Sequence, residues 1–118
     1  MKYNSDYFPF PLIVKFIDGN LWELMANFEY YRPNGELIKV PAGFKFDFAS
    51  IPKFAWSWIG SPTGKYGPAS LIHDFLCVNA TWPRAKTDRI FLEALKDCDV
   101  PYIKRMIMYY AVRIWSFF

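Results

Sequence analysis

The chain contains one histidine, His73, with Asp74 directly after it and Asp88 further along. When a carboxylate accepts a hydrogen bond from one imidazole nitrogen, it fixes the tautomer and leaves the other nitrogen free to act as a general base. A lone histidine in an apolar segment is, however, more often a satisfied core residue than a catalyst. The position of His73 relative to the two aspartates therefore decides between these interpretations.

The sequence places His73 and Asp88 on two neighbouring helices. An apolar run from Ala69 to Val78 predicts one helix, and a second is predicted from Arg84 to Cys98. The turn between them is centred near Thr81, so His73 and Asp88 lie almost equally far from it. Residues equidistant from the turn face each other in an antiparallel helix pair, and we therefore expect both to act in catalysis. The alternative for Asp88 is a structural place in the first turn, where the helix dipole favours an acid.

Asp74 and Asp47 are the candidate metal ligands. Asp74 points about 100° around the helix from His73 and needs a different partner. A glycine-rich loop precedes this helix, and its carbonyl oxygens together with a carboxylate would suit Ca²⁺. Asp47 lies between two phenylalanines, where a carboxylate is costly to bury without a partner. The structural alternatives are that Asp74 caps the preceding loop and that Asp47 bonds the amides that begin the helix at Ser50.

Three further residues are expected to contact a ligand at this site, namely Lys65, Tyr66 and Arg84. The first two lie in the loop before the histidine helix, and Arg84 begins the next helix. The two cysteines, Cys77 and Cys98, have neither the spacing of a metal site nor the number of a disulfide framework. Both fall inside predicted helices, which favours buried free thiols, with a single bridge as the alternative.

The first half of the chain is predicted to consist of antiparallel strands. An apolar run from Leu12 to Ile17 ends at the turn sequence Asp18-Gly19-Asn20. Apolar residues then alternate with polar ones from Trp22 to Tyr30, which predicts one half-buried strand. The pair Asn34-Gly35 predicts a type I′ turn with positive φ angles. Two more strands are expected, at 36–40 and 44–48.

The second half is predicted to be helical. Ser50 is the expected N-cap of a short helix that ends at Trp58. A loop rich in glycine and proline, over 60–68, separates this helix from the pair that carries His73 and Asp88. The sequence thus predicts an α+β fold, in which N-terminal antiparallel β-hairpins precede a helical half with an antiparallel helix pair and a C-terminal apolar helix.

The last helix begins at Pro101 and is apolar on nearly every side. Its main apolar stripe consists of Ile103, Met106, Ile107, Tyr110, Ala111, Ile114 and Trp115. We expect this helix to pack in the core, with Lys104, Arg105 and Arg113 keeping one side in solvent. The alternative is a contact with a membrane surface or with another subunit.

Composition limits the class of protein. A length of 118 residues predicts a single domain over residues 1–118. The hydrophobic fraction of 53% excludes a disordered chain, and the aromatic fraction of 21% predicts exposed aromatic side chains that contact a partner. The basic residues are scattered and the net charge is only +3, so nucleic-acid binding is not expected. The sequence has neither a leader pattern nor a membrane-spanning run, which predicts a soluble protein made in a cytoplasm.

Several short motifs follow one another through most of the chain. They are Val40-Pro41-Ala42-Gly43-Phe44, then Asp47-Phe48-Ala49-Ser50-Ile51-Pro52, then Ala69 with His73-Asp74-Phe75, then Arg84 and Asp88. In this order, from about Trp22 to Ala111, they resemble a family of uncharacterised small phage and prophage proteins. The resemblance implies a viral origin and synthesis in a bacterial host, with a location in the host cytoplasm or in the virion.

The helix pair has a second, narrower resemblance. Its residues Gly67, Ala69, His73-Asp74-Phe75, Asn79, Lys86, Asp88, Phe91 and Cys98 are similar to the helix pair of secreted bacterial and fungal phospholipases A2. That resemblance implies His73 as the general base, Asp88 as the residue that orients it and Asp74 as a ligand of Ca²⁺. The cation would polarise the ester carbonyl. The sequence departs from that family at Cys77, where an aromatic residue is usual, and it lacks the family's disulfides and calcium loop.

The leading hypothesis is a phage-encoded, calcium-assisted esterase of the phospholipase A2 type that acts on host lipids. The first alternative is a non-enzymatic phage accessory protein, either a virion or tail component or an inhibitor of a host protein. In that case His73, Asp74 and Asp88 only join two helices. The second alternative is a hydrolase of another ester or of cell-wall material. The expected partner is a lipid or a host protein, with peripheral membrane contact and an oligomer through the C-terminal helix as further expectations.

Overall fold

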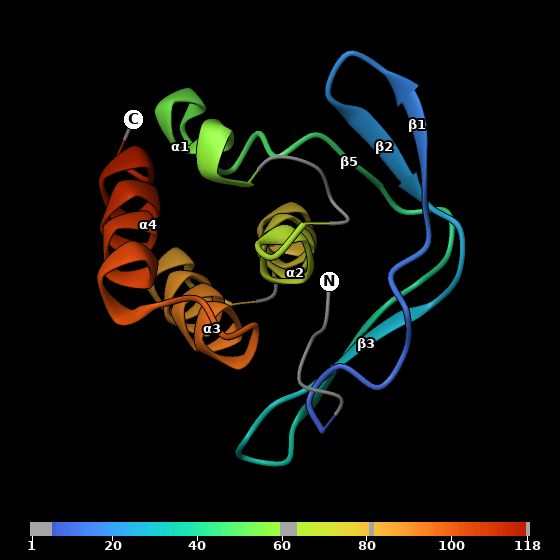
Figure 1. The fold of residues 1–118 in the computed structure, drawn as a ribbon, viewed down its shortest axis with the longest axis horizontal. Coiled ribbons are helices and arrows are strands. Elements are labelled where there is room, and N and C mark those ends of the chain that lie inside the picture. The colour runs from blue at the N-terminus through green and yellow to red at the C-terminus, as the bar shows by residue number, and fades with distance from the viewer. Residues whose placement is uncertain (1–5, 60–63, 81, 118) are drawn as a thin grey trace.

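The arrangement of strands and helices confirms the predicted α+β fold. The computed structural model describes residues 6–59, 64–80 and 82–117 of the chain. Within these residues, five strands come first and four helices follow. Figure 1 shows the strands on one side of the molecule and the other helices opposite them, with helix α2 (Gly67–Asn79) in between. No helix in the described ranges is long and apolar enough to cross a bilayer.

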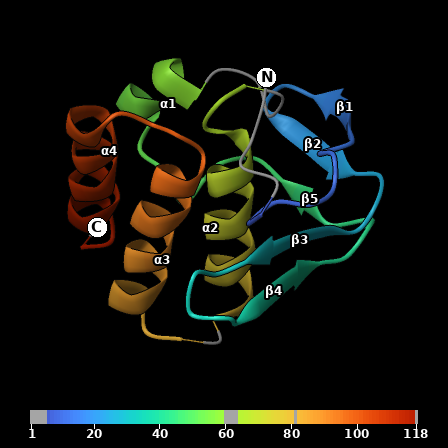
Figure 2. The same cartoon turned by 60° about the horizontal axis from the view of Figure 1, so that its bottom comes forward.

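The strands form two small antiparallel sheets. In the first, the hairpin of β1 (Val14–Asp18) and β2 (Leu21–Leu24) is extended by β5 (Lys45–Phe46), which pairs with β2. In the second, β3 (Phe28–Tyr31) pairs with β4 (Leu37–Val40). One strand from each sheet, β4 and β5, contacts α2, so the two sheets share this helix as their support (Figure 2).

The strand predicted from Trp22 to Tyr30 is wrong as a single element, because the chain leaves the first sheet at 25–27 and enters the second. In this stretch the Asn27 side chain accepts a hydrogen bond from the Ala42 N–H (2.8 Å), which replaces regular strand pairing. The alternation nevertheless continues across the break. The fully buried residues of the run are Leu24, Phe28 and Tyr30.

The turn between β3 and β4 also differs from the prediction. A type I′ turn needs positive φ at both central residues, but of Asn34 and Gly35 only Gly35 has one (93°). The proline ring fixes the φ angle of Pro33 at about −65°. This angle suits an ordinary turn, in which the Gly35 N–H donates to the Arg32 carbonyl (2.9 Å). Asn34 instead acts through its side chain, which accepts a hydrogen bond from the Glu36 N–H (2.9 Å).

The helices are α1 (Lys53–Ile59), α2, α3 (Arg84–Asp97) and α4 (Tyr102–Trp115). As predicted, α2 and α3 form an antiparallel pair (Figure 2). The left-handed backbone of Ala80 (φ 50°) ends α2 before the connecting turn. Every residue from 67 to 74 is buried. This central helix therefore carries His73 and Asp74 into the interior.

The short helix predicted to begin after Ser50 starts later, at Lys53. A tight turn precedes it, in which the Ile51 N–H donates to the Phe48 carbonyl (3.0 Å). Ser50 lies within this turn and is not the N-cap of α1. Its hydroxyl points toward α2 instead, where it meets the side chains of the candidate site.

Helix α4 packs on α3 with a different face from the one predicted. Its buried residues are Met108, Ala111 and Val112. Most of the main apolar stripe is exposed, including Ile103 (70%) and Ile114 (60%). Because α4 is apolar on nearly every side, the spacing of its apolar residues does not identify the buried face.

Candidate active site

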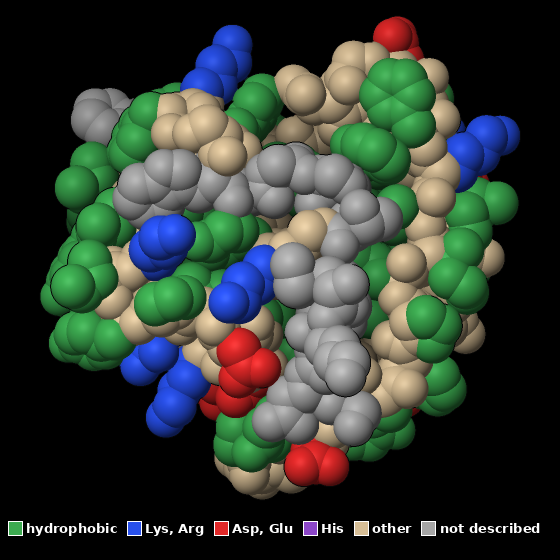
Figure 3. Space-filling view, in the orientation of Figure 1, with side chains coloured by type: hydrophobic (Ala, Val, Ile, Leu, Met, Phe, Trp, Pro, Cys, Tyr) green, Lys and Arg blue, Asp and Glu red, His purple; other side chains and the backbone are tan. Residues whose placement is uncertain are grey.

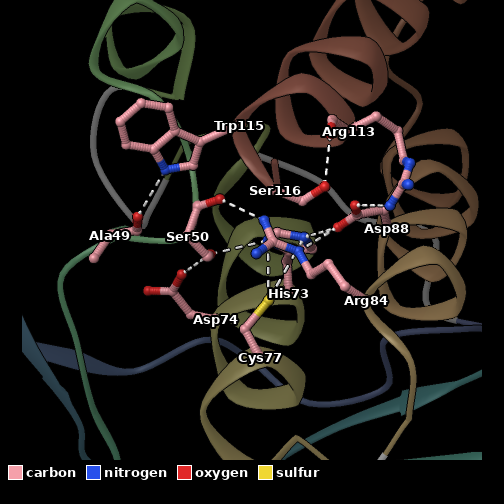
Figure 4. Close-up of polar contacts among 10 residues, drawn as sticks. All are labelled: Ala49, Ser50, His73, Asp74, Cys77, Arg84, Asp88, Arg113, Trp115 and Ser116. Carbon is pink, nitrogen blue, oxygen red and sulfur yellow. Dashed lines mark hydrogen bonds and ion pairs between the residues drawn. The ribbon is translucent and has the colours of Figure 1, made fainter. Parts of the chain in front are cut away.

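His73 and Asp88 make the predicted contact. His73 Nε2 lies 2.6 Å from Asp88 Oδ1, and both side chains are fully buried (Figure 4). The His73 ring packs against Phe91 of α3, with ring centroids 4.7 Å apart. The equal distance of the two residues from the helix turn was therefore sufficient to predict this pair. Their catalytic roles stay predictions.

Asp88 has two further partners, both of them arginines. Arg84 Nε lies 2.8 Å from Oδ1, and Arg113 Nη1, which reaches in from α4, lies 2.8 Å from Oδ2. Burial opposes ionisation of Asp88, but the hydrogen bonds from His73 and the arginines outweigh it and lower the pKa of this carboxyl. Asp88 is therefore a carboxylate that can only accept, and His73 Nε2 must be the donor.

The second imidazole nitrogen is not free, contrary to the prediction. His73 Nδ1 lies 2.9 Å from the hydroxyl oxygen of Ser50. Burial lowers the pKa of His73 despite the nearby Asp88, so the neutral ring is favoured. With its proton on Nε2, this ring presents the lone pair of Nδ1 to the Ser50 hydroxyl.

Asp74 accepts hydrogen bonds from the same segment before α1. Its Oδ2 accepts from the Phe48 N–H (2.7 Å), and its Oδ1 contacts the Ser50 hydroxyl. Phe48 has a left-handed backbone (φ 62°), a conformation that is strained for a residue other than glycine. Burial raises the pKa of Asp74. The aspartate thus holds a strained turn and fixes the position of Ser50.

Ser50 has one proton but faces two groups that can accept it, Asp74 and His73 Nδ1. If Asp74 were ionised beside a neutral His73, one of these acceptors would have no proton. One additional proton would satisfy every group. Burial raises the pKa of Asp74 and lowers that of His73, so burial favours the neutral form of both side chains. Ser50 Oγ thus lies between Asp74 Oδ1 and His73 Nδ1, and His73 Nε2 donates to Asp88.

A pocket of about 290 Å³ opens beside this chain of hydrogen bonds. Ser50, Asp74, Cys77 and Arg84 line it, whereas His73 lies behind them and is fully buried. A molecule in the pocket could therefore reach the Ser50 hydroxyl without contacting the imidazole. Figure 4 shows the Ser50 hydroxyl between Asp74 and His73, with the Arg84 side chain reaching the Ser50 carbonyl.

The residues predicted to bind calcium already have hydrogen-bond partners within the protein. Both oxygens of Asp74 already accept from N–H or O–H donors. Asp47 lines the same pocket, but its Oδ1 accepts from the Ala49 N–H (3.0 Å), close to the structural alternative. Within the described residues, no three side chains of His, Cys, Asp or Glu lie together as a metal site requires. Calcium binding stays a prediction, and no step is derived through it.

The predicted ligand-contacting residues separate into two groups. Arg84 lines the pocket and donates to the Ser50 carbonyl (3.0 Å). Lys65 and Tyr66 lie just before α2 and do not line it, and burial of Tyr66 in the core raises its pKa. The glycine-rich loop before them lies partly outside the described residues, and the partners of Asp74 come from 48–50 instead.

Both cysteines are free, as favoured from the sequence. Cys98 is buried, and burial raises its pKa to about 12. Cys77 is only half-buried, which corrects the expectation for that residue. It lines the pocket with its sulfur 3.8 Å from His73 Nε2. Burial raises the pKa of Cys77 to about 11, so it is a thiol at neutral pH and a weak nucleophile.

Comparison with known proteins identifies the family. A family model described as "Protein of unknown function (DUF1353)" matches residues 22–112. The chain belongs to the DUF1353 family. It is 40% identical over 106 residues to "Uncharacterized protein y4jT" of Sinorhizobium fredii (strain NBRC 101917 / NGR234), an alignment that covers 86% of this chain and 32% of the relative. "Uncharacterized protein y4iH" of the same strain is 31% identical over 90 residues, 75% of this chain and 38% of the relative.

This DUF1353 chain therefore spans about a third of the length of the relatives it matches. The match from 22 to 112 contains all of the candidate site except Arg113, which comes one residue later. No solved structure matches the chain. Membership of the family thus places Ser50, His73, Asp74 and Asp88 inside the matched region without assigning them a role.

Sequence reasoning missed two residues of the DUF1353 site, Ser50 and Arg113. Ser50 was assigned to a helix N-cap, because serine before a short helix is typical of that position. The signals available were its nearness in sequence to Asp47 and its place in the motif Asp47-Phe48-Ala49-Ser50-Ile51-Pro52. Arg113 was expected to lie in solvent, and its ion pair with Asp88 depends on how α4 docks, which no local pattern contains.

Proposed function

We propose that this DUF1353 chain is an ester hydrolase in which Ser50 is the nucleophile, His73 is its base and Asp88 orients His73. One observation carries the proposal, the unbroken line from the Ser50 hydroxyl to Nδ1 (2.9 Å) and from Nε2 to Asp88 (2.6 Å). A hydroxyl, an imidazole and a carboxylate in this order form the arrangement that activates a serine on many unrelated folds. The accessible end of the line is the hydroxyl, as a nucleophile requires.

The proposed reaction has two halves. Ser50 Oγ attacks the ester carbonyl carbon while its proton passes to Nδ1 of His73, and the imidazolium is stabilised by the Asp88 carboxylate. The alcohol leaves with the proton from Nδ1, so an acyl group remains on Ser50. Water then attacks this acyl-serine, gives its proton to Nδ1, and the acid departs as Ser50 takes that proton back.

Other pocket residues support this chemistry. Arg84 and Lys45 both line the pocket and bring positive charge to the place where the carbonyl oxygen becomes negative. Asp74 Oδ1 contacts the Ser50 hydroxyl and holds Ser50 Oγ beside His73 Nδ1. In this mechanism Asp74 positions the nucleophile and does not touch the substrate carbonyl.

The proposal modifies the calcium-assisted, phospholipase A2-like mechanism expected from the sequence. In that mechanism Nδ1 would activate water directly, but here the Ser50 hydroxyl lies at Nδ1. Host lipid esters remain the proposed substrates, and phage origin with a place in the host cytoplasm or virion remains part of the proposal. The names of the two Sinorhizobium fredii relatives mention neither a phage nor a substrate.

A serine-directed covalent probe tests the proposal. The protein is incubated with a fluorophosphonate, which reacts with an activated serine, and the modified peptide is identified by mass spectrometry. We expect labelling at Ser50, lost in His73→Gln, together with hydrolysis of p-nitrophenyl esters that needs no added calcium. Absence of both labelling and ester hydrolysis in folded wild-type protein would refute the proposal.

A second candidate rests on the complete burial of His73 and Asp88. Asp88 joins α2 through His73, α3 through Arg84 and α4 through Arg113, so the cluster could serve only to fix three helices. The protein would then be a non-enzymatic accessory protein, such as a virion component or an inhibitor of a host protein. Ser50→Ala separates the two, because an esterase loses its nucleophile in this variant, whereas a purely structural cluster has no esterase activity to lose.

A further inference from the structure

The outer face of α4 is an apolar stripe that remains exposed to solvent in the described part of the chain. The exposed residues Ile103, Ile107, Tyr110 and Ile114 recur at intervals of three and four, so they lie along one side of the helix. The opposite side, with Met108 and Val112, faces the core. Solvent-exposed aliphatic residues in such a row are typical of a binding surface.

Helix α1 extends this apolar face. A groove of about 590 Å³ separates α1 from α4, and a second of about 520 Å³ continues along α4. Phe54, Ala111 and Ile114 line both grooves, and the Phe54 side chain is 72% exposed. Figure 3 shows hydrophobic side chains gathered along the side of the molecule where α4 lies, with Lys and Arg side chains beside them. We call this surface the α4 face.

The charged residues of α4 are all positive. Residues 101–118 include Lys104, Arg105 and Arg113 but no Asp or Glu. Lys104 is exposed next to the stripe, and Lys53 is exposed where it lines the first groove. Arg113 is excluded from this set because Asp88 already neutralises it. Exposed cations beside exposed aliphatic and aromatic side chains are the pattern of a helix that lies in the interface of an anionic membrane.

We infer that the α4 face binds the surface of a membrane that contains anionic lipids. The stripe would enter the boundary between headgroups and acyl chains, and Lys104 and Lys53 would meet lipid phosphates. A second copy of the chain fits less well, because an antiparallel pair of α4 helices would bring cations together without a carboxylate on either helix. The inference does not depend on the proposed esterase activity, since it uses none of the site residues.

Vesicle co-sedimentation tests this inference. Wild-type protein is expected to sediment with vesicles of equal parts phosphatidylglycerol and phosphatidylcholine, and to remain in solution with phosphatidylcholine alone. Ile103→Ser with Ile114→Ser should weaken binding by at least ~10-fold, because full transfer of one isoleucine from water is worth about that factor. Lys104→Glu should weaken binding to the anionic vesicles by roughly fivefold or more.

The matched control is Ile13→Ser with Met25→Ser, since these exposed residues lie among the strands, away from α4. It should bind as the wild type does, and so should Ser50→Ala, which tests the esterase separately. The inference is overturned if wild-type protein does not sediment with anionic vesicles, or if the control loses binding equally. A concentration-dependent dimer that the Ile103→Ser, Ile114→Ser variant abolishes, in protein that ignores vesicles, would assign the α4 face to a second copy instead.

Discussion

The substitution Ser50→Ala separates a nucleophile from a structural hydroxyl more clearly than any change at His73 or Asp88. Asp88 has three partners and is fully buried, so its removal damages the fold whether or not the protein is an enzyme. Ser50 lies at the pocket and is only half-buried. Its hydroxyl can be deleted with a smaller effect on folding, so activity and stability can be measured independently.

The expected effect on stability follows from the two contacts that are lost. Without the hydroxyl, Asp74 Oδ1 and His73 Nδ1 each lose a partner, and an unsatisfied buried group costs about 1–3 kcal/mol. The pocket has a volume of about 290 Å³, and a water molecule takes about 30 Å³, so water can replace the hydroxyl. We therefore expect Ser50→Ala to lower the free energy of unfolding by only about 1 kcal/mol.

The expected effect on catalysis is much larger. Removing the nucleophile of a serine hydrolase eliminates the covalent route, and we expect kcat for a p-nitrophenyl ester to fall by at least ~10³-fold. The matched control is Ser70→Ala, at a serine on α2 three residues before His73. Ser70 Oγ is buried with no hydrogen-bond partner in the described part of the chain, so its loss should leave both activity and stability unchanged. If Ser50→Ala keeps more than about a tenth of the wild-type kcat while Ser70→Ala is normal, Ser50 is not the nucleophile.

Three further predictions concern protonation, burial and calcium. Because the folded-state pKa of Asp74 is raised by burial, its contribution to stability is lost as pH rises from about 4 through that pKa. Asp74→Asn should therefore be relatively more stable, compared with wild type, at pH 7 than at pH 4.5 in urea denaturation, and a pH-independent difference would contradict the assignment. Tyr30→Phe should cost about 1–3 kcal/mol of unfolding free energy, because the buried Tyr30 hydroxyl donates to Asp97 (2.7 Å) and contacts Glu93 (3.0 Å). Tyr31→Phe, at an exposed hydroxyl, should change it by less than about 0.5 kcal/mol. Millimolar Ca²⁺ should leave Tm unchanged, because both Asp74 oxygens already have hydrogen-bond partners. A rise in Tm that Asp74→Asn abolishes would instead show that Asp74 binds Ca²⁺.

The sequence predicted the parts of the fold that depend on local geometry. The contact between His73 and Asp88 follows from their places in a helix hairpin, because a short turn leaves little freedom in how the two helices align. The predicted buried face of the run from Trp22 to Tyr30 is correct, although the run forms two strands and not one. Side chains alternate between the two faces in both β2 and β3.

The errors occurred where distant parts of the chain compete with local preference. Ser50 has the local features of an N-cap, but the side chains of His73 and Asp74 on α2 bind its hydroxyl instead. On α4, apolar residues lie on nearly every side, so only docking against α3 selects Met108 and Val112 as the buried ones. The turn at Asn34-Gly35 is another example. The proline ring fixes the φ angle of Pro33 at a value that suits the turn closed by Arg32 and Gly35, which forms instead of the type I′ turn.

Arg113 joins the outermost helix to the most deeply buried carboxylate. Its guanidinium neutralises Oδ2 of Asp88 from α4, while the other carboxylate oxygen is held by His73 and Arg84. A small outward displacement of α4 would remove one positive charge from Asp88 and so raise its affinity for a proton. Linkage makes this relation reciprocal: an event that shifts α4 changes the protonation of the histidine pair, and a change in that protonation alters the energy of shifting α4. The position of the outer helix and the protonation of the interior are thus linked through the Arg113 side chain.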